Sequence, residues 1–346
     1  MAPAGTVMMP PCAPHLMFCR GRGRGRGRGR AHAAAAPNTV MSPPPCSSDG
    51  RLKLSDFEWV ADLGEGASGV VTKVRLRGTT TTLFALKVAH YPAPDAGKEH
   101  DELLRRATGS PHLVRCHAIL RGDANQPACL LELMDAGSLA RVRGALPEPA
   151  LAEVAARCVA GLAHLHARGV AHLDIKPDNI LASSQGDAKI GDFSVSRILP
   201  PPACGTDRSR SRVVSIAVGT TAYMSPERFA PNAQAGPRGA CAADIWSLGI
   251  TVLELFLGHR PILPAEERPS WKMLRDAICE GEPPSVPENA AAASEELRRF
   301  VEACLHKDPR RRATAAQLLD HPFVASRDLQ ASRQALREII RDTMQA

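Results

Sequence analysis

The sequence predicts an α+β protein of two lobes, with strands gathered in the first part of the chain and helices in the second. Strand-like alternation of apolar residues dominates as far as about Met134, and helical spacing dominates after it. This separation favours an α+β fold over alternating βα units. A cleft between the two lobes is where we expect a ligand to bind.

Three apolar runs in the first part are expected to form strands. In "GVVTKVRLRG" every second residue from Val70 to Leu76 shares one face, and "TLFALKVA" repeats this pattern from Leu83 to Lys87. "CLLELM" is a third and more uniformly apolar run. A period of two over such short runs is typical of strands with one buried face.

Longer amphipathic runs in the second part predict helices. "ALAEVAARCVAGLAHLHARG" keeps apolar residues on one face from Leu151 to Leu165, and Gly169 supplies a stop signal. "DIWSLGITVLELFLG" predicts a second helix from near Asp244 to Gly258, apolar enough on all sides for a buried position. "SEELRRFVEACL" predicts a third. A further amphipathic helix is expected within residues 325–346, covering the helical lobe.

The positive charge of the chain is concentrated at its beginning. The formal net charge is +7, and residues 1–48 contain six arginines, no lysine and no acid, which leaves about +1 for the rest. Residues 1–50 are rich in Pro, Ala, Gly and Ser and contain "GRGRGRGRGR", so we expect a disordered basic arm. A docking arm for an acidic partner, an RNA-binding RG tract and an organelle transit peptide are alternative roles.

The rest of the composition is that of a globular protein. Apolar residues make up 44% of the chain and charged residues 23%. No run of about 18 apolar residues is present, so no membrane span is expected. The ten cysteines are scattered without a CxxC pair, which favours free thiols in a reducing compartment over disulfides or zinc ligands. We expect a cytoplasmic protein, with the nucleus and an organelle as alternatives.

A glycine-rich stretch and a lysine indicate a phosphate site. In "LGEGASGVV" three glycines have the spacing GxGxxG, which lets backbone N–H groups approach phosphate oxygens. A dinucleotide-binding fold has the same spacing, but there a helix follows, whereas here a strand is expected. Lys87 lies in an apolar strand shortly afterwards, where its ammonium needs a phosphate or a carboxylate. The predicted nucleotide-binding residues of the loop are Leu63, Gly64, Glu65, Gly66, Ala67, Ser68, Gly69, Val70 and Val71.

Two further stretches carry polar groups among apolar neighbours. In "VAHLDIKPDNIL" Asp174 could accept a proton from a hydroxyl, Lys176 could steady negative charge, and Asn179 could offer its carbonyl oxygen to Mg²⁺. In "IGDFSVS" Asp192 could bind the same metal, because two protein oxygens plus substrate phosphates suit Mg²⁺. Taken singly, each aspartate is better explained as a turn or cap residue. Because all four stretches occur together in this order, they favour one site that binds a metal ion, a triphosphate and a substrate hydroxyl.

Together these residues resemble a eukaryotic protein kinase. The resemblance extends from about Phe57 to Phe323 and rests on "LGEGASGVV", "FALK", "HLDIKPDNIL", "DFSVS", "GTTAYMSPERF", "DIWSLGI" and "DPRRRATAAQLLDHPF". "MDAGSL" and "VGTTAYMSPERF" are similar to mitogen-activated protein kinase kinases, and "SPHLVRCHAIL" and "DFSVSRIL" to their plant branch. The resemblance implies a kinase fold, with a small antiparallel-sheet N-lobe in 51–134, a helical C-lobe in 135–324 and a helical tail in 325–346.

The resemblance also implies an activity and its partners. It implies phosphorylation, with ATP and Mg²⁺, of a downstream mitogen-activated protein kinase on Thr and Tyr of its activation loop, after activation by an upstream kinase. Ser209 and Ser215 have the phosphosite spacing of the family, and Ser211 is a decoy between them. A catalytically weak or inactive pseudokinase that acts as a scaffold in the same cascade is the alternative.

Further roles follow from the resemblance for residues outside the loop stretches. The segment from Glu132 to Met134 is implied to form a hinge that receives adenine, next to Leu131, which controls the pocket behind it. Glu227 is implied to pair with Arg312. Asp244 is implied to brace the loop that carries Asp174.

The sequence departs from the family pattern beside the expected site. Leu173 stands where the family usually has an arginine that meets the phosphorylated loop, and Ser194 replaces a glycine. His100 stands where an acid should pair with Lys87; Glu99 is the predicted partner, and Glu102 is an alternative. The residues expected to act on the substrate are nevertheless all present, which favours an active enzyme.

Overall fold

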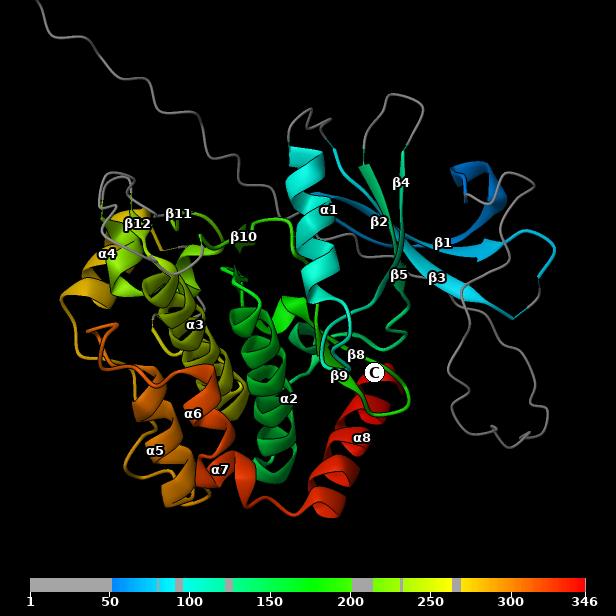
Figure 1. Cartoon of the computed structure of the whole chain (residues 1–346). Helices are drawn as coiled ribbons and strands as arrows, with labels where there is room; N and C mark the ends of the chain where they lie inside the picture. The colour runs from blue at the N-terminus through cyan, green and yellow to red at the C-terminus, as the bar shows by residue number, and fades with distance from the viewer. Residues whose placement is uncertain are drawn as a thin grey trace, which may run out of the picture. The chain divides into compact units, whose positions relative to one another are not determined.

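The computed structural model describes residues 52–79, 81–90, 96–121, 127–200, 214–230, 233–262 and 269–345. All of them belong to one structural unit of the chain, 43–346. Within it, a sheet-rich N-lobe is followed along the sequence by a helical C-lobe (Figure 1). The predicted two-lobed α+β fold is therefore confirmed. The predicted basic arm lies outside the described residues.

A five-stranded antiparallel sheet forms the N-lobe. Its spatial order is β1 (Phe57–Gly66), β2 (Gly69–Leu76), β3 (Leu83–Val88), β5 (Pro127–Glu132) and β4 (Cys116–Arg121). The helix α1 (Ala96–Ala107) lies beside this sheet (Figure 1). After β3 the chain passes through α1. On its return, β5 rather than β4 pairs with β3.

Alternation in β3 explains why a lysine occurs in an apolar strand. Phe84 and Leu86 belong to one apolar core, together with Leu130 of β5. Ala85 and Lys87 point to the other face, where they line a cavity. The expected period of two is therefore present, and it directs the ammonium of Lys87 away from the apolar core.

Helices form most of the C-lobe. They are α2 (Glu148–Ala167), α3 (Pro237–Leu257), α4 (Trp271–Cys279), α5 (Glu295–Cys304), α6 (Ala315–Leu319), α7 (Pro322–Ala325) and α8 (Leu329–Gln345). Three small sheets pair β6 (Gly137–Ser138) with β8 (Ile180–Ala182) and β9 (Ala188–Ile190), β7 (Val170–Ala171) with β10 (Arg197–Ile198), and β11 (Val214–Ser215) with β12 (Gln234–Ala235).

The two longest helices contain the predicted apolar runs, but one of them starts earlier than expected. The predicted apolar face of α2 is buried from Leu151 to Leu165. α3 begins at Pro237 rather than near Asp244, because Pro237 favours the first helical position and alanines extend the helix. It ends as expected at Gly258, whose φ of 74° is the left-handed conformation that glycine adopts at helix ends.

α3 is a core helix of the C-lobe. By length and composition it is apolar enough to cross a membrane, yet 83% of its apolar window is buried inside the protein. Trp246 is fully buried, and Gly249 lets Cys304 and Leu305 approach the helix closely. The apolar character of α3 is therefore satisfied by packing within the fold.

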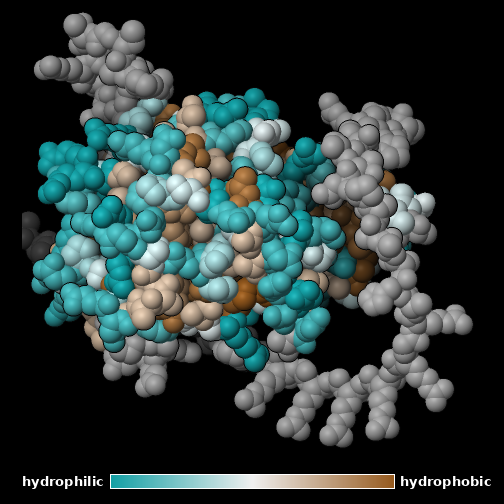
Figure 2. All heavy atoms as spheres, turned by 90° about the horizontal axis from the view of Figure 1, so that it is seen from below, coloured by the Kyte–Doolittle hydropathy of each residue, from teal (hydrophilic) through white to brown (hydrophobic). Residues whose placement is uncertain are grey.

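α8 lies within the tail expected at 325–346. Its Leu336 and Ile340 are buried, whereas Leu329 and Met344 are exposed, and the helix packs on α2. Seen from below, where the C-lobe helices lie in Figure 1, hydrophilic residues surround small hydrophobic patches (Figure 2). The described tail thus covers the C-lobe with its apolar side.

The Gly249→Ala substitution is expected to destabilise the C-lobe by overpacking. A Cβ at this position would lie 2.7 Å from the Cβ of Cys304 and 2.8 Å from the Cδ2 of Leu305. Such a change costs about 1–3 kcal/mol, which urea unfolding would measure. Gly236→Ala is the control, because no atom lies within 4 Å of its added Cβ. An equal loss of stability in both variants would contradict the close contact at α3.

Candidate active site

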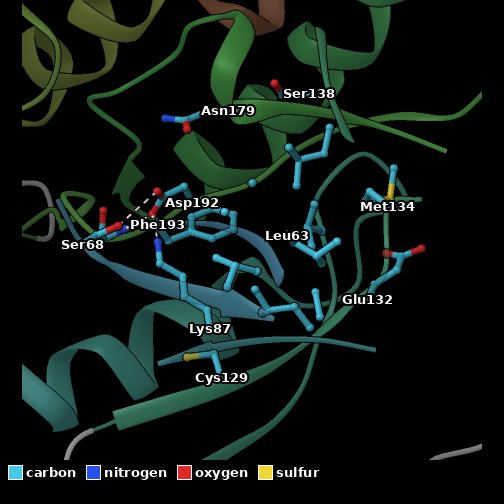
Figure 3. Close-up of a pocket in the computed structure, with 18 of the residues that line it drawn as sticks. Leu63, Ser68, Lys87, Cys129, Glu132, Met134, Ser138, Asn179, Asp192 and Phe193 are labelled. Carbon is cyan, nitrogen blue, oxygen red and sulfur yellow. Dashed lines mark hydrogen bonds and ion pairs between the residues drawn. The ribbon is translucent and has the colours of Figure 1, made fainter. Parts of the chain in front are cut away.

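A cavity of about 420 Å³ lies where the N-lobe sheet meets the C-lobe loops. Figure 3 shows its lining, with apolar side chains such as Leu63 on one side and polar groups gathered around Asp192. Lys87 and Asn179 border the polar end. An apolar cavity with a few convergent polar groups is the usual form of a small-molecule site.

The glycine-rich stretch joins two strands, as expected. β1 and β2 form a hairpin in which Gly66 pairs with Gly69. Gly69 has a φ of 151°, and a Cβ there would lie 2.2 Å from the carbonyl oxygen of Val88, so only glycine fits. The cavity is lined by four of the nine predicted loop residues, namely Leu63, Gly64, Ser68 and Val71. The other five are not among its lining residues, and they are Glu65, Gly66, Ala67, Gly69 and Val70.

Lys87 forms an ion pair with Asp192 across the two lobes. Its Nζ lies 2.6 Å from Oδ1 of Asp192, and Figure 3 shows the ammonium directed at that carboxylate. Burial raises the pKa of Asp192, but Lys87 outweighs this effect and lowers it to about 2. Asp192 is therefore ionised at neutral pH.

The predicted pair between Lys87 and Glu99 is not formed in this structure. Glu99 is exposed on α1. The alternative acid, Glu102, instead pairs with Arg106 at 2.8 Å. Two α1 residues, His100 and Leu104, line the cavity, and Nε2 of His100 lies 3.7 Å from Sγ of Cys129. The rotation of α1 about its axis thus directs the imidazole of His100 toward the cavity, whereas Glu99 and Glu102 do not line it.

Asp174, Lys176 and Asn179 come together in the loop after β7. Nδ2 of Asn179 donates to Oδ2 of Asp174 at 2.8 Å, and Nζ of Lys176 lies 2.9 Å from the same oxygen. Although burial raises the pKa of Asp174, Lys176 and a hydrogen bond from Thr220 lower it overall. Because the amide nitrogen of Asn179 is used in this way, its carbonyl oxygen is the atom available to a cation.

Asp244 of α3 braces this loop from below. Its buried carboxylate accepts hydrogen bonds from the backbone N–H groups of His172 at 2.8 Å and Leu173 at 2.6 Å. Leu173 has a φ of 66° and Asp192 one of 57°, and these are the only non-glycine residues with positive φ among those the structure describes. Backbone strain of this kind clusters at functional sites.

Asp244 also holds His166 of α2. Its Oδ2 lies 2.9 Å from Nε2 of His166. Burial alone would lower the pKa of this imidazole, but hydrogen bonds with Asp244 and Cys241 and the charge of Asp244 raise it to about 9. The pair is therefore a buried ion pair at neutral pH.

A buried arginine that the sequence did not single out ties the loop to the segment after it. Nη2 of Arg228 donates to the carbonyl oxygen of Leu173 at 3.0 Å, and its Nε donates to that of Ile216 at 2.8 Å. Leu173 and Ile216 are themselves buried in one apolar cluster. An arginine on a short turn is usually a surface residue, so no sequence signal marked Arg228.

Glu227, the neighbour of Arg228, forms the expected pair with Arg312. Both bonds of this fork are 2.6 Å long, and the guanidinium of Arg312 lies over the ring of Trp246. The pair links the segment after the loop to the end of the C-lobe. Removing one partner would leave a buried charge alone.

The remaining predicted residues have different outcomes. Glu132 and Met134 border the cavity, and the side chain of Glu132 pairs with Lys189 at 2.5 Å. Ser215 is exposed in β11, whereas Ser209 lies outside the described residues. The backbone N–H of Ser194 donates to Oδ1 of Asp192 at 3.2 Å, a bond that does not involve the serine side chain.

Comparisons with known proteins agree on one family. The protein kinase domain model matches residues 50–324. Mitogen-activated protein kinase kinase 9 of Arabidopsis thaliana is 44% identical over 278 residues, which cover 79% of this chain and 86% of the relative. Mitogen-activated protein kinase kinases 7 and 10 of the same plant are 42% and 36% identical, with the same coverage.

The His166–Asp244 pair is expected to make stability depend on pH. Because the pKa of His166 rises from 6.5 to about 9 on folding, its contribution is complete below pH 6.5 and is lost as pH rises through about 9. Urea unfolding at pH 6 and pH 10 measures it. His166→Gln keeps a donor without this titration, so the wild type should lose on the order of 3 kcal/mol more than the variant between the two pH values. Parallel losses would contradict a charged His166.

Proposed function

The chain belongs to the protein kinase family, among the plant mitogen-activated protein kinase kinases, and we propose that it is an active dual-specificity member. It would transfer the γ-phosphate of ATP to Thr and Tyr of the activation loop of a downstream mitogen-activated protein kinase. The observation that carries this proposal is the convergence of Lys87, Asp192 and Asn179 on one cavity. The family supports a place in a mitogen-activated protein kinase cascade.

The polar end of the cavity fits a magnesium-bound triphosphate. The carboxylate of Asp192 and the carbonyl oxygen of Asn179 are hard oxygen ligands, and both residues line the cavity. Mg²⁺ bound there would neutralise charge on the phosphates. Lys87, already held at Asp192, is placed to meet a phosphate, and the apolar remainder suits an adenine ring.

Asp174 is the residue proposed to act on the substrate hydroxyl. Oδ1 of Asp174 accepts a hydrogen bond from the backbone N–H of Thr220 at 2.7 Å, and Oδ2 is held by Lys176 and Asn179. These bonds fix the orientation of an ionised carboxylate that can orient a hydroxyl and accept its proton. Lys176, beside it, would stabilise negative charge on the transferred group.

Regulation is proposed to act through Ser209 and Ser215. An upstream kinase would phosphorylate them, and the added charge would act through new pairs with cations. Leu173 supplies no cation to meet these phosphates. Arg197 of β10 carries a positive charge on the segment that follows Asp192. Its Nη1 donates to the carbonyl oxygens of Val195 and Ser196.

A scaffold with little activity is the second candidate, and one observation favours it. Lys87 lacks a carboxylate partner from α1, because His100 occupies the cavity side of that helix. Such a protein would bind its cascade partners without transferring phosphate.

The Asp174→Asn substitution is expected to separate these candidates. If Asp174 handles the substrate proton, phosphoryl transfer should fall by about 10³-fold while ATP affinity changes little. The measurement is an in vitro assay of the chain carrying Ser209→Asp and Ser215→Asp, with and without Asp174→Asn, against a panel of mitogen-activated protein kinases, with mass spectrometry of the modified Thr and Tyr. Equal labelling by both proteins would show that the phosphate comes from another source, and no labelling by either would favour the scaffold.

Replacing Ser209 and Ser215 together by aspartate is expected to raise the transfer rate several-fold, because the added charge partly mimics two phosphates. Ser211→Asp is the matched control, since it adds charge to the same segment at a position that the family spacing excludes. The rate of transfer to the preferred partner kinase measures the effect. An equal increase with Ser211→Asp would show that any negative charge on this segment raises the rate, and it would contradict a specific role of Ser209 and Ser215.

A further inference from the structure

Two cysteines and a histidine form a cluster behind the candidate nucleotide cavity. Cys129 of β5 lines the cavity, and its Sγ lies 3.7 Å from Nε2 of His100 on α1. The thiol of Cys116 on β4 interacts directly with that of Cys129. Figure 3 shows Cys129 on the side of Lys87 that faces away from Asp192. Nothing in the proposed phosphoryl transfer uses these thiols.

Strand register explains how the two thiols meet. Cys129 pairs with Lys87 of β3, and Cys116 pairs with Leu131 on the other side of β5. Because Cys129 and Leu131 are two residues apart on one strand, Cys116 and Cys129 share a face of the sheet as diagonal neighbours. A register shift between Cys116 and Ala118 leaves β4 irregular at this point.

The surroundings of Cys129 favour its thiolate. The neighbouring Cys116 thiol lowers the pKa of Cys129, burial opposes this, and His100 and Lys87 lower it further. The pKa of Cys116 is raised in turn. Cys158 shows the opposite environment, because its complete burial raises its pKa to about 12. A thiolate beside a lysine and an imidazole, and open to a cavity, is a reactive nucleophile.

We propose that Cys129 and Cys116 form a peroxide-sensitive thiol pair at the back of the cavity. The thiolate of Cys129 attacks one oxygen of a hydroperoxide, so that the O–O bond breaks, an S–O bond forms and an alcohol or water leaves after taking up a proton. His100 is placed to accept the proton that the Cys129 thiol releases. Cys116 then attacks the Cys129 sulfenic acid, an S–S bond forms, and water leaves.

The oxidised pair would alter the wall that holds Lys87. The backbone of Cys129 is bonded to that of Lys87 through the β3–β5 ladder, so a link from Cys129 to Cys116 pulls on the strand beside the ammonium. If the proposed function is right, oxidation should lower nucleotide affinity by about tenfold or more, and dithiothreitol should restore it. This consequence rests on the proposed function, whereas the thiol chemistry does not.

The test is peptide mapping of the full-length protein after brief treatment with hydrogen peroxide. Cys279 is the internal control, since it is half-buried and burial raises its pKa. We expect Cys129 to be oxidised at least about tenfold faster than Cys279 and to be recovered in a disulfide with Cys116 that dithiothreitol reverses. Reduced Cys129 that reacts no faster than Cys279, or oxidised Cys129 joined to no other residue, would overturn the proposal.

Two variants assign the roles within the cluster. Cys116→Ala should abolish the disulfide and leave a Cys129 sulfenic acid that dimedone traps, and His100→Asn should slow the oxidation of Cys129. Unchanged rates in His100→Asn would remove His100 from the proposal, and thermal unfolding verifies that both variants are folded. Nucleotide binding to the reduced wild type is measured in parallel. If that binding is absent, the proposed function fails while the thiol result stands by itself.

Discussion

The buried carboxylate of Asp244 is the constraint on which the centre of this molecule depends. It accepts the N–H groups of two successive residues, and so it holds Leu173 in a left-handed conformation that costs an ordinary residue about 1–2 kcal/mol. That turn sets the direction in which the chain leaves β7, and it thereby aims Asp174 toward Asn179 and Thr220. Without the carboxylate, two buried N–H groups would lack partners, and each would cost about 1–3 kcal/mol.

The ion pair between Lys87 and Asp192 is the second constraint on the site. The period of two in β3 sends Lys87 to the cavity face, where burial would be costly if no anion were near. Asp192 supplies that anion from the opposite lobe, and its own carboxylate is stabilised by the same contact. Asp244 fixes the backbone of one loop through hydrogen bonds. The ion pair between Lys87 and Asp192 fixes the position of one lobe's polar group against the other lobe's, within an otherwise apolar cavity.

The sequence predicted the features that local chemistry decides. Strand alternation put Lys87 and Ala85 on one face, which lines the cavity, and the glycine spacing predicted a loop that joins two strands. The sequence did not predict features that depend on how distant elements pack against each other. The partner of Lys87 depends on how α1 is rotated against the sheet, and this rotation is set by contacts distant in sequence. Arg228 looked like a surface residue until the structure placed it between two buried carbonyl oxygens.

The departures from the family pattern share a location, and this location is informative. Asp174, Asn179 and Asp192 are kept, whereas the changes fall beside them, at His100, Leu173 and Ser194. At Leu173 an apolar side chain packs with Ile216, so that burial holds the segment where a cation would otherwise have met a phosphate.

At His100 the exchange has a different physical effect. A carboxylate there would neutralise Lys87 and would repel a thiolate, whereas an imidazole leaves Lys87 to Asp192 and favours negative charge on Cys129. The same substitution leaves the lysine without a carboxylate from α1 and, in the proposed thiol chemistry, favours the reactive form of Cys129. Control of this site is therefore better sought in apolar packing and thiol chemistry than in the ion pairs that the family pattern implies.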